Sequence, residues 1–132
     1  MAEKSIETSK KLAAQRQIEA AILHYQAGQY ECAVTLAHAG ENVAGHGAKN
    51  FFQALKEKMF DTDHNQFANW LKHPSGAPTA TLLEMEVLAM IQRGISNYNA
   101  VYGGVTQQMG KFMSEMRSRF KVDSGKRGGK SV

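Results

Sequence analysis

The sequence contains one cysteine, two prolines and no long apolar run. Cys32 cannot form a disulfide within its own chain, and it cannot by itself build a thiolate metal site. No segment approaches the ~20 consecutive apolar residues that cross a bilayer. Residues 1–11 are polar and charged, unlike the apolar core of a signal peptide. These absences favour a cytoplasmic protein that does not enter a membrane.

The two prolines, Pro74 and Pro78, fall in one short segment, which leaves long proline-free stretches that suit helices. In those stretches apolar residues recur every three or four positions, as on one face of a helix. The spacing predicts helices over residues 5–27, 30–44, 48–59, 64–72, 81–102 and 105–120. No alternating pattern predicts a strand. A chain of 132 residues suits one domain, so we expect an all-α, up-and-down bundle of four to five helices over residues 1–120.

Several local features refine this prediction. Residues 61–63 read as a turn and helix cap, and Thr81 with Glu84 has the spacing of a capping box. Gly94 lies inside a helix, where it costs about 1 kcal/mol relative to alanine, so we expect a neighbouring helix close to it. Cys32 reads as a small core residue. The other expected core positions include Ile6, Ile18, Ile22, Phe67, Trp70, Leu71, Leu83, Val87, Met90, Met109, Phe112, Met113 and Met116.

The net charge of +4 is unevenly distributed. Residues 1–110 carry nine basic and ten acidic side chains, whereas residues 111–132 carry seven basic and two acidic ones. The basic residues at the end include Lys126, Arg127 and Lys130, among glycines and serines. We therefore expect residues 121–132 to form a disordered basic tail, able to contact the phosphates of a nucleic acid.

The chain shows no Gly-rich phosphate loop, no H-E-x-x-H and no G-x-S-x-G, and we expect no cofactor. His38 and Glu41 are three residues apart and could face one metal ion, but no second pair completes a di-metal bundle site. We therefore expect no metal, and a hydrogen-bonded polar role for His38. Glu41 follows an alanine-rich face, so it is either half-buried with a partner or exposed near a helix end.

One cluster could support chemistry. Asn69, Lys72 and His73 place an amide, a cation and an imidazole at the end of a short helix, beside the proline-containing loop. An imidazole can transfer protons near neutral pH, and a lysine can bind phosphate. The plainer interpretation is a helix end with a solvated lysine and a histidine that suits the helix dipole.

Three segments resemble the HEPN superfamily of small α-helical proteins. They are HYQAGQYECAVTLAHAGE at residues 24–41, ANWLKH at residues 68–73, and EVLAMIQR with YNAVY at residues 86–93 and 98–102. The resemblance implies a four- or five-helix bundle that often dimerises. It also implies kinship with metal-independent RNases. Their motif is an arginine and a histidine with four to six residues between them, and a polar residue directly after the arginine.

Mapped onto this chain, His73 matches the histidine and Asn69 the polar residue, but Ala68 stands where the arginine belongs. An alanine cannot donate to a phosphate, and lysine does not replace the bidentate arginine. The activity is then absent and the fold serves binding, or Lys72 or Arg93 supplies the charge. We favour the first.

Three hypotheses follow. The first is a non-catalytic, homodimeric HEPN-like module that binds a protein or nucleotide-type partner. The resemblance suggests a nucleotidyltransferase-like protein as that partner. Glu41 and Arg93 are the candidate binding residues of this module. The second is a weak RNase using His73, Asn69 and Lys72. The third is RNA or DNA binding through the basic tail.

Overall fold

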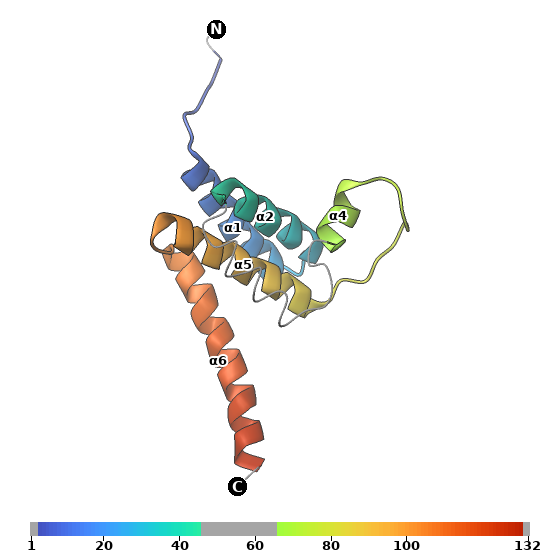
Figure 1. Cartoon of the computed structure of the whole chain (residues 1–132), viewed down its shortest axis with the longest axis vertical. Coiled ribbons are helices and arrows are strands. Elements are labelled where there is room, and N and C mark those ends of the chain that lie inside the picture. Colours follow the sequence, from blue (N-terminus) through green and yellow to red (C-terminus); the bar gives the residue numbers. More distant parts are fainter. Residues whose placement is uncertain (1–2, 46–65, 131–132) are drawn as a thin grey trace.

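A computed structural model describes residues 3–45 and 66–130, with the side chains of Gln66, Ala68, Asn69 and residues 121–130 outside the description. This part of the chain folds into five helices and contains no strand, which confirms the all-α bundle (Figure 1). The helices are α1 (Lys10–Gln26), α2 (Tyr30–Ala44), α4 (Gln66–Lys72), α5 (Glu84–Tyr102) and α6 (Gln107–Lys130). The helix expected over 48–59 and the turn at 61–63 lie outside the described residues.

The first helix begins later than its apolar pattern suggests. Ser9 is the N-cap, with extended backbone, and its hydroxyl accepts a hydrogen bond from the Leu12 amide at 3.1 Å. This cap satisfies one of the free amides of the first turn, so the helix starts there rather than at Ser5. Ile6 therefore precedes the helix and is 81% exposed, so the expectation that it joins the core is wrong.

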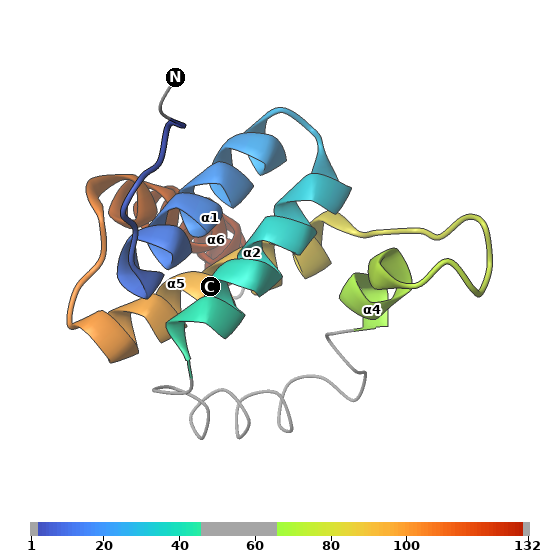
Figure 2. The ribbon, with the colours of Figure 1, turned by 90° about the horizontal axis from the view of Figure 1, so that it is seen from above.

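Helices α1 and α2 form an antiparallel hairpin that packs over α5 (Figure 2). The turn uses Gly28 at φ 77°, a left-handed conformation that glycine adopts without strain. Gly40 allows the two helices to lie close together, because a Cβ placed there would be only 2.7 Å from Ile18 Cγ1. The alanine-rich face of α2 is buried as expected, and its core residues are Ala33, Val34, Ala37 and Ala44. Cys32 lies off this face and is exposed, which corrects the core assignment.

Helix α5 carries the most extensive buried stripe. Its core residues are Val87, Leu88, Met90, Ile91, Ile95 and Tyr98. Gly94 does lie against a neighbouring helix, since a Cβ there would be 3.4 Å from the Ala37 carbonyl oxygen of α2. The capping box is wrong: the helix begins at Glu84 with Leu83 as its cap. The Glu84 carboxylate is engaged by other helices and does not serve Thr81, and Leu83 is 58% exposed.

Helix α6 starts after Thr106, whose hydroxyl accepts a hydrogen bond from the Met109 amide at 3.3 Å. Met109, Phe112 and Met116 are buried against the other helices, as expected. The helix then continues through the segment expected to be disordered, as far as Lys130. Figure 1 shows this C-terminal half extending away from the other helices. None of the helices that the structure describes is long and apolar enough to span a bilayer.

Candidate functional site

The expected cluster around His73 lies at the end of α4. Lys72 is the last helical residue, and both Lys72 and His73 are exposed. The Trp70 indole N–H donates to the Ala77 carbonyl at 2.8 Å, which fastens the following loop to the helix. Trp70 also contacts Phe67, with ring centroids 5.5 Å apart. Asn69 lies on the helix, and its side chain is outside the description. Within residues 3–45 and 66–130, no hydrogen bond or ion pair joins Arg93 to His73.

Arg93 is instead paired with Glu41 of α2. Its Nε donates to Glu41 Oε1 at 2.7 Å, and the two side chains are only 21% and 15% exposed. The pair joins α5 to α2. Of the two interpretations of Glu41 that the sequence left open, the structure shows the half-buried one, with a partner.

Asn97, one turn after Arg93 on α5, fastens the end of α2. Its side-chain amide donates to the carbonyl oxygens of Glu41 and Gly45 at 3.1 and 3.0 Å, and the Glu41 carbonyl also accepts from the Gly45 amide at 3.3 Å. Asn97 is 3% exposed. Its position one helical turn from Arg93 was a usable signal, since residues four apart share a helix face.

His38 lies one turn before Glu41 on the same face of α2 and is 8% exposed. Burial lowers the pKa of His38, and the positive charges of Lys72 and Arg93 lower it further, so the ring is neutral at pH 7. Its Nδ1 atom is buried and has no hydrogen-bond partner, so the expected hydrogen bond at that atom is not found. Helix α4, which ends at Lys72, packs against α2.

His38, Glu41, Arg93 and Asn97 together form what we call the α2–α5 polar cluster. The cluster has three buried polar atoms without a hydrogen-bond partner: His38 Nδ1, Glu41 Oε2 and Arg93 Nη1. Leaving a buried polar atom unpaired costs roughly 1–3 kcal/mol, and more for a charged group. Unmet hydrogen-bonding capacity on two ionised side chains and an imidazole is therefore costly here, and it marks the cluster as the candidate binding site. No group of three metal-binding side chains occurs in the part of the chain that the structure describes.

A second polar group lies near the hairpin turn and was not predicted. The Glu84 carboxylate forms an ion pair with Arg119 of α6, whose Nη2 donates to Oε1 at 2.6 Å. It also accepts hydrogen bonds from the hydroxyls of Tyr25 and Tyr30, at 3.4 and 3.3 Å. The Arg119 hydrogen bond is the main cause that lowers the pKa of Glu84. Burial, and then the Glu84 charge, raise the pKa of both tyrosines. Through Glu84 of α5, this group joins α6 to the α1–α2 hairpin.

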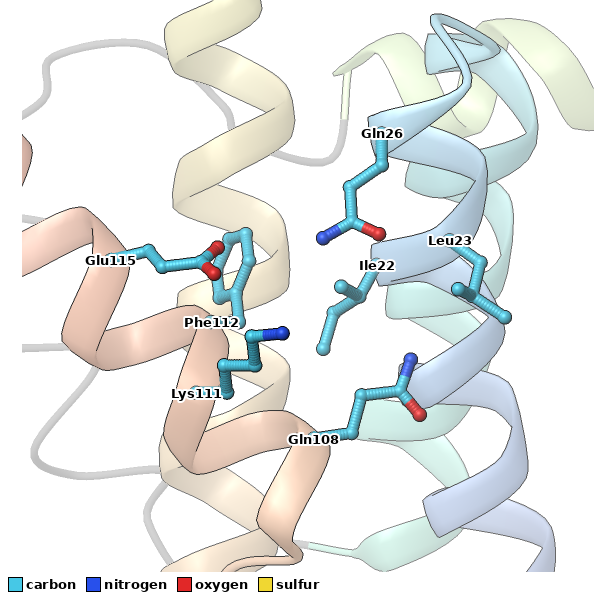
Figure 3. A pocket seen from close by; sticks show the side chains of 7 residues that line it. All are labelled: Ile22, Leu23, Gln26, Gln108, Lys111, Phe112 and Glu115. Carbon is cyan, nitrogen blue, oxygen red and sulfur yellow. The ribbon is translucent and has the colours of Figure 1, made fainter.

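A hollow of about 270 Å³ separates α1 from α6. Its floor includes Phe112, and Figure 3 shows the polar ends of Gln26 and Lys111 directed toward the space between the two helices. Nearby, the Gln108 amide donates to the Glu19 carbonyl at 3.1 Å and ties the helices together. The polar ends that line this hollow reach solvent, so water can satisfy their hydrogen bonds. The hollow is therefore a weaker candidate for a binding site than the α2–α5 polar cluster.

Comparison with protein-family models, with curated proteins and with solved structures finds no match for this chain. The function is therefore inferred from the residues and their geometry.

Proposed function

We propose that this chain is a non-catalytic, HEPN-like helical protein that works as a dimeric binding module in the cytoplasm. The observation that carries the proposal is the 2.7 Å contact between Arg93 and Glu41. An exposed, unpaired Cys32 suits a reducing compartment.

Binding is supported because Arg93, a guanidinium that RNA cleavage would need beside a histidine, is already paired with Glu41. An RNase of the HEPN kind uses a histidine for proton transfer and a guanidinium to stabilise charge on the phosphate. Here His73 is exposed beside the loop after α4, while Glu41 occupies the Nε edge of the Arg93 guanidinium. Position 68 offers an alanine. The half-buried Glu41 carboxylate holds the Arg93 guanidinium in one position. A fixed guanidinium suits recognition of a ligand better than stabilisation of the charge that develops on a reacting phosphate.

The test compares RNA cleavage by the purified protein and by a His73→Ala variant, with mixed RNA and a chelator present. We expect the rate of RNA cleavage with either protein to equal the rate in buffer alone. Cleavage that disappears in His73→Ala would establish the alternative, a weak RNase, and would defeat the proposal.

The dimer is tested separately by light scattering. We expect the mass of two chains at high micromolar concentration, and a monomer there would contradict a dimeric module. Co-expression with a neighbouring nucleotidyltransferase-like protein, followed by size-exclusion chromatography, tests the partner that the resemblance suggests. Co-elution is expected if that protein is the partner.

One observation favours a second candidate function, binding of nucleic acid through α6. Figure 1 shows the C-terminal half of α6 extending away from the other helices, and α6 ends with a segment that contains Lys126, Arg127 and Lys130. Contacts of lysine and arginine with phosphates would make the affinity fall steeply with salt. Deleting residues 121–132 should then reduce affinity for RNA or duplex DNA at low salt, and unchanged affinity would exclude residues 121–132 as the binding element.

A further inference from the structure

The α2–α5 polar cluster offers a ligand both a donor and an acceptor. Arg93 uses its Nε–H for Glu41, and its Nη1 is buried without a partner. Glu41 accepts from Arg93 through Oε1, and its Oε2 is buried without a partner. His38 adds an unpartnered Nδ1, which donates or accepts according to its tautomer. A ligand that satisfies Arg93 and Glu41 must present acceptor oxygens and at least one hydroxyl or amine.

The charges of the cluster favour an anion. Arg93 and, from the end of α4, Lys72 are positive, whereas Glu41 supplies one negative charge and His38 is neutral. The guanidinium is also planar, and the donors that Glu41 leaves unused suit two oxygens of one anion. Glu41 selects among anions, because its free oxygen repels an anion that has no proton to share.

Building on the binding function proposed above, we propose that the α2–α5 polar cluster binds a phosphate group that retains a P–OH, as in a phosphate monoester. The anionic oxygens pair with Arg93 and lie in the field of Lys72, and the P–OH donates to Glu41 Oε2. A monoester phosphate has its second pKa near 6, so it shares one proton at mildly acidic to neutral pH. Sulfate has the same shape and no proton under these conditions, and a phosphodiester within an RNA chain has none either.

Isothermal titration calorimetry of the full chain at about pH 6 tests the assignment, with inorganic phosphate, adenosine monophosphate and sulfate as probes. Phosphate and the nucleotide should bind, and sulfate should bind roughly tenfold to a hundredfold more weakly, the value of one hydrogen bond to a charged acceptor. A 5′-phosphorylated RNA oligonucleotide and its dephosphorylated counterpart identify the source. Binding of the mononucleotide points to a free nucleotide, and binding of the phosphorylated oligonucleotide alone points to an RNA end.

Glu41→Gln tests the role of the carboxylate directly. An amide donates as well as accepts, so this variant should lose the preference for phosphate and bind both anions with similar affinity. Arg93→Lys should weaken both by about tenfold or more, because an ammonium cannot hold Glu41 and an anion in one plane. Arg16→Lys, on the exposed side of α1, is the matched control and should change neither.

Variants of the ion pair could fail to fold, so Lys72→Ala provides an independent test at an exposed position. It should weaken phosphate and sulfate binding several-fold alike, whereas Lys111→Ala on α6 should have no effect. Three results would each overturn the assignment: no saturable binding of phosphate to the wild-type chain, which would leave the cluster to water; equal binding of sulfate by wild type; or unchanged selectivity in folded Glu41→Gln. RNA cleavage and dimer mass are read in separate assays, so failure here is distinguishable from failure of the proposed function.

Discussion

Gly40→Ala and Gly94→Ala form a matched pair of perturbations that measures how closely the central helices approach. Both glycines lie within helices, where alanine is favoured over glycine by about 1 kcal/mol. An alanine Cβ at Gly40 would lie 2.7 Å from Ile18 Cγ1 and 3.2 Å from the Ala14 carbonyl oxygen. At Gly94 the nearest atom would be the Ala37 carbonyl oxygen, at 3.4 Å.

The two contacts predict opposite signs. Ile18 is fully buried and its branched side chain is stiff, and the Ala14 oxygen belongs to helix backbone, so neither yields easily. Overpacking of this kind costs about 1–3 kcal/mol, which exceeds the gain in helix propensity and leaves Gly40→Ala destabilised by about 1–2 kcal/mol. Gly94→Ala meets only borderline van der Waals contact, so we expect it to be neutral or stabilised by up to about 1 kcal/mol.

Urea unfolding followed by circular dichroism measures both effects. At a slope of about 2 kcal/mol/M, the midpoint of Gly40→Ala should fall by about 0.5–1 M, with the slope unchanged. The midpoint of Gly94→Ala should stay or rise. If Gly40→Ala proved as stable as wild type, the close packing of α1 on α2 would be refuted.

Three further predictions concern polar groups. Asn97→Ala removes the side-chain hydrogen bonds to the Glu41 and Gly45 carbonyls and should lower the free energy of unfolding by about 1–3 kcal/mol. An unchanged midpoint in urea unfolding would contradict this. The pKa of His38 is lowered by burial, so the stability present above pH ~6.5 should decline as the pH falls below that value toward the folded pKa; an NMR titration showing an ordinary pKa would contradict this. The pKa of Glu84 is lowered chiefly by Arg119, so ionised Glu84 stabilises the fold at pH values above the ordinary carboxyl pKa, and this stability is lost as the pH falls through the folded pKa. Glu84→Gln should remove this pH dependence and reduce the effect of salt on stability; an unchanged pH dependence would contradict the assignment.

The sequence predicts best those helix ends at which a glycine stops the helix. Gly28 and Gly103 both adopt positive φ at helix ends, and the bounds of α2 agree with the apolar pattern between its flanking residues. Starting points are harder, because several residues can serve as caps. Ser9 rather than Ser5 caps α1, and Glu84 is drawn away from Thr81 by side chains on other helices. Periodicity within one segment contains no information about such competition.

The candidate site was predicted only in part for a related reason. The sequence identifies Glu41 as a polar residue after an apolar face and Arg93 as a candidate source of positive charge. Their pairing depends on how α2 and α5 are rotated and shifted against each other. The spacing within one helix does suggest that His38 and Glu41 share a face. Cys32 illustrates the opposite error, since a residue type that is often buried lies here on the exposed side of α2.

The most direct measurement is the hydrogen exchange of the Arg93 Nε–H, followed by NMR in a ¹⁵N-labelled chain. If Glu41 holds the guanidinium within the bundle, this signal should be resolved and should exchange much more slowly than those of the exposed Arg16 and Arg117, and Glu41→Gln should accelerate it. Exchange as fast as that of the exposed arginines would show a guanidinium free to act elsewhere and would contradict the account.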